Sequence, residues 1–182
     1  MLYNKKVILK NNSVCIIENA SENNACEILD LLKRTCVQSD FLLSYPEEII
    51  FTVEQERDFL ESKKVSNDEV LLCAKIDGKI IGTASINKIG NNYKVKHRAE
   101  FAVAIEKDFW NIGVGNKLSL ACIELAKMSG YKQLELTVVS TNFSAISLYK
   151  KIGFVEYGRN PKGFLLKNGE WRELIQMRLE LD

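Results

Sequence analysis

The chain is poor in the residues that build metal sites and disulfide frameworks. Its 182 residues include one histidine, His97, and no two of its cysteines form a C-x-x-C pair. The five cysteines are odd in number, widely spaced and set in apolar patterns, which predicts reduced core thiols in a cytoplasmic protein. With so few soft ligands available, we expect neither a zinc site nor any other bound metal.

Long apolar runs and an excess of one charge are also missing. No window approaches the run of about 18 apolar residues that a membrane span needs, and the first ten residues are too polar for a signal peptide. The net charge of +1 argues against a nucleic-acid partner, because neutralising phosphates requires a basic surface. The 46% of hydrophobic and 27% of charged residues are typical of a globular protein, and we expect one domain over residues 1–182.

The most informative segment that is present is W-N-I-G-V-G-N at residues 110–116. It follows a strand-like run and opens an amphipathic helix, so two glycines let several N–H groups converge at a positive helix end. This arrangement predicts an anion cradle suited to pyrophosphate. The spacing matches neither G-x-G-x-x-G nor G-x-x-x-x-G-K-[ST], which argues against a dinucleotide fold or an NTPase. The candidate cradle residues are Asn111, Ile112, Gly113, Val114, Gly115 and Asn116.

Turn and cap signals divide the chain into alternating strands and helices. A first strand over 14–18 precedes a helix that Ser21 caps, and the capping box Thr52-x-x-Gln55 begins a second helix. Asp77-Gly78 joins two β-rich runs into a hairpin. The remaining elements are a strand over 98–105, a helix over 113–129, a strand over 134–139, a helix over 142–152, and two strands within 154–181.

The order of these elements is β-α-α-β-β-β-α-β-α-β-β. It predicts an α/β (α+β) fold with a mixed central sheet of about seven strands flanked by four helices.

Three segments between residues 100 and 154 resemble the GCN5-related N-acetyltransferase (GNAT) superfamily, whose members bind acetyl-CoA. E-F-A-V-A-I at 100–105 is similar to the fourth strand of that family. N-I-G-V-G at 111–115 is similar to its R/Q-x-x-G-x-G/A loop, although Trp110 stands where Arg or Gln is usual. N-F-S-A-I-S-L-Y-K-K-I-G-F at 142–154 is similar to its N-x-x-A-x-x-L-Y-x-x-x-G-F helix.

The resemblance implies which residues contact acetyl-CoA. The cradle would hold the pyrophosphate, and the backbone of the strand at 103–105 would run beside the pantetheine arm. Asn142 is expected as a helix N-cap, and the resemblance adds a contact with the same arm. The implied acetyl-CoA contacts outside the cradle are Val103, Ala104, Ile105, Asn142, Ala145 and Tyr149.

Tyr149 has two interpretations. On an apolar helix face it is typical of a core residue, whereas the resemblance makes its hydroxyl the general acid that faces the sulfur. A tyrosine pKa of about 10 against a thiol pKa of about 8.5 makes complete proton transfer uphill. A hydrogen bond that stabilises the leaving thiolate therefore describes the role better than proton donation.

Glu100 is the implied base, because the stretch from Leu136 to Ser140 contains no acid. If its carboxylate is buried beside Phe101 and Val103, the pKa is raised into a range that suits a base. The alternative is a carboxylate that faces solvent at a strand end. His97 is the second candidate, and ordered water the third.

The acceptor side is the least defined part of the sequence. The connection at 41–50 is apolar for a loop, and Phe41, Leu42 and Tyr45 are expected to line a pocket beneath Glu47 and Glu48. Carboxylates there would favour a cationic amine. The alternative is a helix connection with a hydrophobic anchor.

The expected function is transfer of the acetyl group of acetyl-CoA to a primary amine of a small molecule or peptide, or to a protein amino group. The implied mechanism is direct attack within a ternary complex. A non-catalytic acyl-CoA sensor on the same fold is the alternative, and an unrelated nucleotide-binding protein is a third class. A homodimer is left open.

Overall fold

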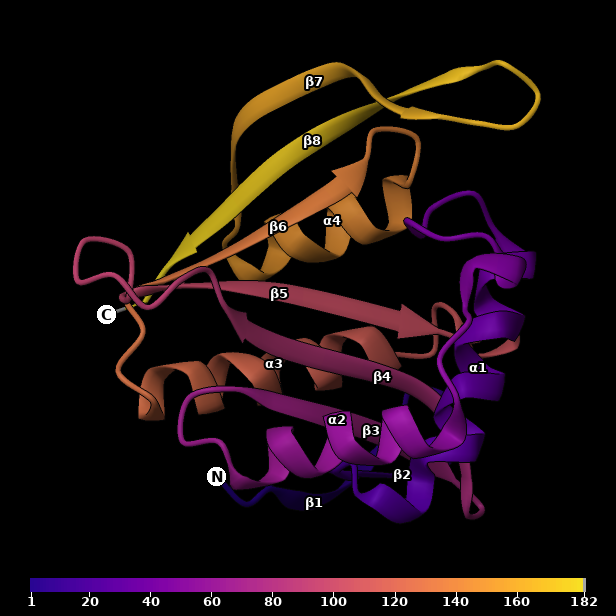
Figure 1. The fold of residues 1–182 in the computed structure, drawn as a ribbon, viewed down its shortest axis with the longest axis vertical. Helices are drawn as coiled ribbons and strands as arrows, with labels where there is room; N and C mark the ends of the chain where they lie inside the picture. The colour runs from indigo at the N-terminus through magenta and orange to yellow at the C-terminus, as the bar shows by residue number, and fades with distance from the viewer. Residues whose placement is uncertain (182) are drawn as a thin grey trace.

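The computed structural model describes residues 1–181, which form an eight-stranded mixed sheet with four α-helices (Figure 1). The strands lie in the order β1-β2-β3-β4-β5-β6-β8-β7. The strands are β1 (Asn4–Ile8), β2 (Val14–Asn19), β3 (Val70–Ile76), β4 (Lys79–Lys88), β5 (Arg98–Ile105), β6 (Gln133–Val139), β7 (Val155–Leu165) and β8 (Trp171–Glu180). The helices are α1 (Ala25–Gln38), α2 (Val53–Val65), α3 (Val114–Met128) and α4 (Phe143–Ile152), with short 3₁₀ turns at Glu22–Asn24, Pro46–Glu48 and Lys107–Phe109.

The predicted mixed sheet is confirmed, but the sequence missed one strand, β1. This strand pairs antiparallel with β2 at the edge of the sheet and is mostly exposed. Its residues N-K-K-V-I carry no alternation of apolar and polar side chains. Because an edge strand with little burial needs no such alternation, the pattern did not reveal it.

The helices cover both faces of the sheet. Leu72 and Ala74 of β3 belong to the main core with α3, whereas Cys73 between them packs in a second cluster with α1 and α2. This alternation follows from the two-residue period of a strand. Among residues 1–181, no helix is long and apolar enough to cross a membrane.

The predicted helix ends are confirmed where local chemistry determines them. Thr52 Oγ1 accepts a hydrogen bond from the Gln55 N–H at 3.1 Å, and Gln55 Oε1 accepts one from the Thr52 N–H at 2.9 Å. Ser21, expected to cap α1 directly, instead precedes the 3₁₀ turn that leads into that helix.

The cysteines are free, as expected, but they are not all core residues. Cys15, Cys73 and Cys122 are buried, Cys36 is intermediate and Cys26 is exposed.

One opening in the sheet prepares the site. β5 runs parallel to β6 but pairs with it only from Arg98 to Glu100. From Phe101 onward, β5 keeps its pairing with β4 and has none with β6 among the described residues. The main-chain groups of β5 that face the opening are therefore free to bind another extended group.

Candidate active site

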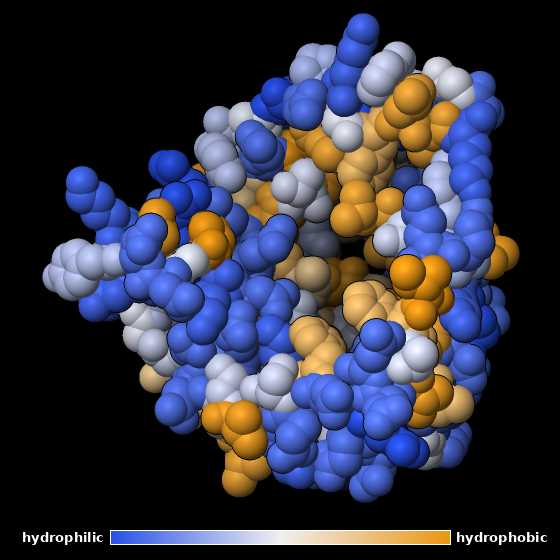
Figure 2. All heavy atoms as spheres, viewed as in Figure 1, coloured by the Kyte–Doolittle hydropathy of each residue, from blue (hydrophilic) through white to orange (hydrophobic). Residues whose placement is uncertain are grey.

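A cavity of about 670 Å³ lies at the carboxyl end of β5. Figure 2 shows a hollow rimmed by apolar side chains, at the place where Figure 1 has the gap between α4 and the end of β5. Its lining comes from the β1–β2 turn, the end of α1, the α1–α2 connection (residues 39–52), β5, the glycine loop (residues 110–116) and α4. The cavity therefore gathers segments from most of the chain.

Most of the predicted site residues line this one cavity. Only Val114 and Glu100 among them are absent from its wall. The Val114 side chain is buried in the core with α3, and Glu100 is described below. The predicted residues that line the cavity are Val103, Ala104, Ile105, Asn111, Ile112, Gly113, Gly115, Asn116, Asn142, Ala145 and Tyr149.

The glycine loop has the form of an anion cradle. Gly113 is the N-cap of α3 with a φ of 103°, and Asn111 has a φ of 63°. Within residues 1–181, none of the main-chain N–H groups from Asn111 to Asn116 donates to a protein acceptor. Unpaired N–H groups at the positive end of a 15-residue helix suit an anionic ligand. Val114 contributes its N–H to this set although its side chain is buried.

Gly115 keeps the cradle open. A Cβ atom at this position would lie 3.2 Å from both Ile105 Cδ1 and Leu148 Cδ2. Any larger residue would therefore press on β5 and α4 at the cavity wall. The glycine is needed for close approach rather than for its dihedral angles.

The charged side chains around the cavity are lysines. Lys10, Lys117 and Lys151 line it, and the wall residues include no Asp or Glu. Lys10 comes from the β1–β2 turn, and its Nζ lies 3.4 Å from the main-chain oxygen of Asn111. The electrostatic character of this cavity favours an anion.

Tyr149 is 7% exposed and lines the cavity from α4. Its ring makes an edge contact with Phe101 (centroids 6.2 Å apart) and a tilted contact with Phe154 (5.8 Å). Burial raises the pKa of Tyr149 to about 12. Its hydroxyl makes no hydrogen bond within residues 1–181, so it is a neutral donor available to a ligand.

Asn142 caps α4, as expected. Its Oδ1 accepts a hydrogen bond from the Ala145 N–H at 3.2 Å, which satisfies one orphan donor of the first turn. The Nδ2 group donates to no acceptor in the part of the chain that the structure describes. The side chain can therefore cap the helix and still donate into the cavity.

Of the two interpretations of Glu100, burial beside Phe101 and Val103 is wrong and the solvent-facing alternative is confirmed. Its side chain is exposed, because it alternates with the buried residues Ala99 and Phe101 and so lies on the other face of β5. At about 3.3 Å per residue, Glu100 lies roughly 10 Å along the strand from Val103. A proton could reach it only through solvent or an acceptor molecule.

Two other titratable groups lie near Glu100. Glu135 is opposite it on β6, but Arg98 holds that carboxylate in a bidentate pair and keeps its pKa below its usual range. His97 is exposed before β5 begins, roughly 20 Å from Val103. Glu100 itself forms no ion pair among residues 1–181. Its carboxylate is therefore unpaired, in contrast to that of Glu135 opposite it.

Glu47 and Glu48 of the α1–α2 connection already have partners. Glu47 pairs with Lys167 at the tip of the β7–β8 hairpin, and Glu48 accepts a hydrogen bond from the Tyr45 N–H at 2.7 Å. These carboxylates stabilise the connection, which weakens the expectation that they select a cationic acceptor. Phe41 and Leu42 do line the cavity, whereas Tyr45 does not.

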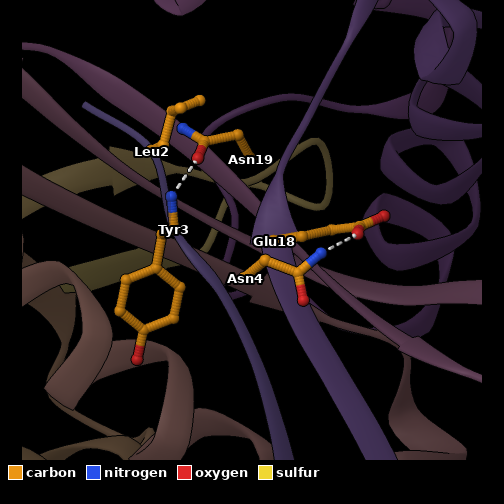
Figure 3. A pocket seen from close by; sticks show the side chains of 5 residues that line it. All are labelled: Leu2, Tyr3, Asn4, Glu18 and Asn19. Carbon is orange, nitrogen blue, oxygen red and sulfur yellow. Dashed lines mark hydrogen bonds between the residues drawn. The ribbon is translucent and has the colours of Figure 1, made fainter.

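A second, smaller hollow of about 350 Å³ lies beside β1 (Figure 3). Its polar groups bind one another: the Tyr3 N–H donates to Asn19 Oδ1 at 2.6 Å, and Asn4 Nδ2 donates to Glu18 at 3.0 Å. With its polar groups satisfied, this hollow is a poorer ligand site than the cavity. In the part of the chain described, no three His, Cys, Asp or Glu side chains lie together as metal ligands would.

Comparison with known proteins agrees with this geometry. Residues 34–154 match the model of the Acetyltransferase (GNAT) family. The chain is 33% identical over 107 residues to the L-amino acid N-acetyltransferase AaaT of Escherichia coli, a match covering 58% of this chain and 65% of that protein. It is 28% identical over 113 residues to an L-methionine sulfoximine/L-methionine sulfone acetyltransferase of Pseudomonas paraeruginosa, covering 62% and 65%. The matches thus span just under two thirds of these relatives.

Solved structures are similar over nearly the whole chain. A GNAT-family acetyltransferase from Streptococcus pneumoniae has a TM-score of 0.87 and 30% identity, covering 91% of this chain and 99% of that one. The putative acetyltransferase yncA from Salmonella typhimurium, solved with its cofactor acetyl-CoA, has a TM-score of 0.81 and 20% identity, covering 92% and 94%. The latter likeness shows the fold.

Proposed function

Since the chain belongs to the acetyltransferase (GNAT) family, we propose that it transfers the acetyl group of acetyl-CoA to a primary amine of a small molecule or peptide. The observation that carries the proposal is the meeting, in one cavity, of the unpaired N–H groups at 111–116 and the free hydroxyl of Tyr149. The first supplies an anion cradle and the second a hydrogen-bond donor beside it.

The residues present fit acetyl-CoA. The N–H groups of the glycine loop and the nearby lysines would hold its phosphates, and the opening beside residues 101–105 of β5 would take the pantetheine arm as an added strand. Asn142 Nδ2 is free to donate to the same arm. When bound, acetyl-CoA supplies the acetyl group as a thioester.

Tyr149 is proposed to stabilise the leaving thiolate by a hydrogen bond. With a pKa of about 12, its hydroxyl holds its proton far more tightly than a thiol with a pKa of about 8.5. Proton transfer to sulfur would therefore be strongly uphill, whereas a short hydrogen bond involves no such transfer. Phe101 and Phe154 orient the ring for this donation.

Glu100 is proposed as the base that takes the proton of the attacking amine through a water molecule. Its freedom from ion pairs leaves its oxygens available as acceptors, whereas Arg98 occupies those of Glu135. Because Glu100 is exposed, water can connect it to an acceptor that enters from its face of the sheet.

The curated relatives suggest which acceptors to test first. Since two of them are named as acetyltransferases of L-amino acids and of L-methionine sulfoximine or sulfone, we propose a small amine acceptor. We further propose one catalytic domain over residues 1–182 and a cytoplasmic location, which is consistent with the free cysteines. A homodimer stays a prediction for sedimentation measurements.

The proposed activity is tested with acetyl-CoA and a panel of L-amino acids, methionine sulfone, polyamines and peptides with free N-termini. Thiol release that depends on one class of amine supports the enzyme. Acetyl-CoA binding without amine-dependent thiol release would instead support the acyl-CoA sensor. If acetyl-CoA neither binds nor raises the melting temperature, the proposal is wrong.

A further inference from the structure

Trp110 occupies the loop position that usually carries Arg or Gln, and its side chain makes two specific contacts. The indole Nε1–H donates to the main-chain oxygen of Ile105 at 2.7 Å. The ring stacks on Phe41, with centroids 6.3 Å apart and planes inclined by 23°. Trp110 therefore connects the last residue of β5 to the connection between α1 and α2.

Neighbouring contacts attach the same two segments to each other. Gln38 Oε1 at the end of α1 accepts a hydrogen bond from the Lys107 N–H at 2.7 Å. Arg34 Nε lies 3.3 Å from the buried carboxylate of Glu106. The end of α1 is thus fixed to residues 106–107, and Trp110 extends this attachment beyond the helix to Phe41.

The middle of the connection is held by the β7–β8 hairpin. The Lys167 N–H donates to the Tyr45 hydroxyl at 3.0 Å, and the Lys167 ammonium lies 4.2 Å from the centroid of the Tyr45 ring. Between these two attachments, Phe41 and Leu42 form part of the cavity wall. The position of the wall therefore depends on both anchors.

We propose that Trp110 is a positioning residue that holds Phe41, and with it the acceptor side of the cavity wall, against the end of β5. That this wall faces the acceptor amine rests on the proposed function. An indole suits the task because it donates a hydrogen bond and stacks at the same time. The main-chain N–H groups of the cradle do not depend on which side chain stands at position 110. The loop therefore does not need a cationic side chain there.

Three variants separate the two contacts. Trp110→Phe keeps a ring for stacking and removes the hydrogen bond, Trp110→Leu removes both, and Phe41→Leu removes the stacking partner without changing the loop. Phe51→Leu is the matched control, since Phe51 lies at the α2 end of the same connection, is 60% exposed and is absent from the cavity wall. The melting temperature of each variant shows that it is folded.

The first measurement needs no catalysis. Hydrogen exchange of the amides at 39–45 is expected to accelerate about 10-fold in Trp110→Leu and Phe41→Leu, and less in Trp110→Phe, while exchange at 70–86 stays unchanged. Unchanged exchange at 39–45 in both leucine variants overturns the inference, whether or not the protein is an acetyltransferase.

The second measurement uses the best acceptor of the panel. In Phe41→Leu and Trp110→Leu, the acceptor KM is expected to rise about 10-fold, while kcat at saturating acceptor stays within about 2-fold of wild type. For Phe41→Leu, the Kd of acetyl-CoA is expected to stay within about 2-fold. The double variant is expected to be no worse than Trp110→Leu, because the stacking contact that Phe41→Leu removes is already lost in Trp110→Leu. Fully additive effects, or an unchanged acceptor KM, contradict the inference.

Discussion

The main-chain N–H of Lys10 donates to the main-chain oxygen of Ile112 at 3.0 Å. This hydrogen bond attaches the β1–β2 turn to the glycine loop and places the Lys10 side chain along Gly113, where a Cβ atom would lie 3.7 Å from Lys10 Cγ. Lys10 lies outside the family match at 34–154. The N-terminal hairpin therefore adds a cation beside a cradle whose own first position carries no charge.

Lys10→Met is expected to raise the Kd of acetyl-CoA about 3- to 10-fold at low salt. The removed charge lies beside the cradle, and an exposed ion pair with a phosphate contributes about 1 kcal/mol. Calorimetric titration with acetyl-CoA measures the loss, which should shrink as salt screens the charge.

Lys6→Met is the matched control, because Lys6 lies on the same hairpin but not at the cavity. Its Kd is expected to stay at the wild-type value, and acetyl-pantetheine, which lacks the phosphates, should bind Lys10→Met and wild type equally. Equal acetyl-CoA affinity in Lys10→Met and Lys6→Met would show that Lys10 makes no phosphate contact.

Gly115→Val is expected to weaken acetyl-CoA binding by about 10- to 100-fold. The new side chain would press on Ile105 and Leu148, each already 3.2 Å from the position of a Cβ, and overpacking of this kind costs about 1–3 kcal/mol. The rise in melting temperature with acetyl-CoA measures the change. Gly90→Val is the control, since its Cβ would also meet one side chain at 3.2 Å, that of Val95, but far from the cavity. A wild-type thermal shift in Gly115→Val would count against the position of the cradle.

Local signals explain what the sequence predicted well. The Thr52–Gln55 capping box and the Asp77-Gly78 turn each depend on neighbouring residues, so the pattern alone locates them. The residues of the cradle and of α4 were likewise recognisable because they are contiguous motifs. Their meeting in one cavity follows from the fold that the motifs imply.

The contacts that the sequence did not predict join distant residues. Lys10 reaches the loop across about a hundred positions, and Trp110 reaches Phe41 from another element. Nothing in the local pattern at either residue indicates its partner, because such contacts depend on tertiary placement. The exposure of Glu100 is the alternative that the sequence left open, and strand alternation favours it, since its neighbours Ala99 and Phe101 are apolar.

Tyr149→Phe is expected to lower kcat by about 10- to 1000-fold, the range for one hydrogen bond to developing charge. The Kd of acetyl-CoA should change less than about 2-fold, because the loop at 111–116 is untouched. Steady-state kinetics and calorimetry together measure the two effects. Tyr131→Phe is the control, a second buried tyrosine that does not line the cavity. An unchanged kcat in Tyr149→Phe would show that the ring only packs.

The raised pKa of Tyr149 also predicts how stability depends on pH. In the folded protein this pKa is about 12, against about 10 in an unfolded chain, so burial of the neutral phenol stabilises the fold below pH 10. As pH rises from 10 toward 12, the unfolded state loses the proton first and that stabilisation declines. Between pH 9 and 11, wild type should lose about 1.4 kcal/mol more free energy of unfolding than Tyr149→Phe. Urea unfolding at each pH measures this, and parallel curves would contradict the burial of a neutral phenol.

Glu100→Gln is expected to slow acetyl transfer most at pH values below the pKa of the acceptor amine. There the amine must lose a proton before it attacks, and the amide of glutamine cannot accept one. At higher pH the amine is already neutral, so the variant should recover most of its rate. A pH–rate profile of kcat/KM for the acceptor measures this recovery, with Glu54→Gln, an exposed charge change at the start of α2, as control. Profiles of Glu100→Gln and wild type that are parallel at every pH would remove Glu100 from the mechanism. Because Glu135 is held by Arg98 and His97 lies far from the cavity, ordered water would then be the remaining route for the proton.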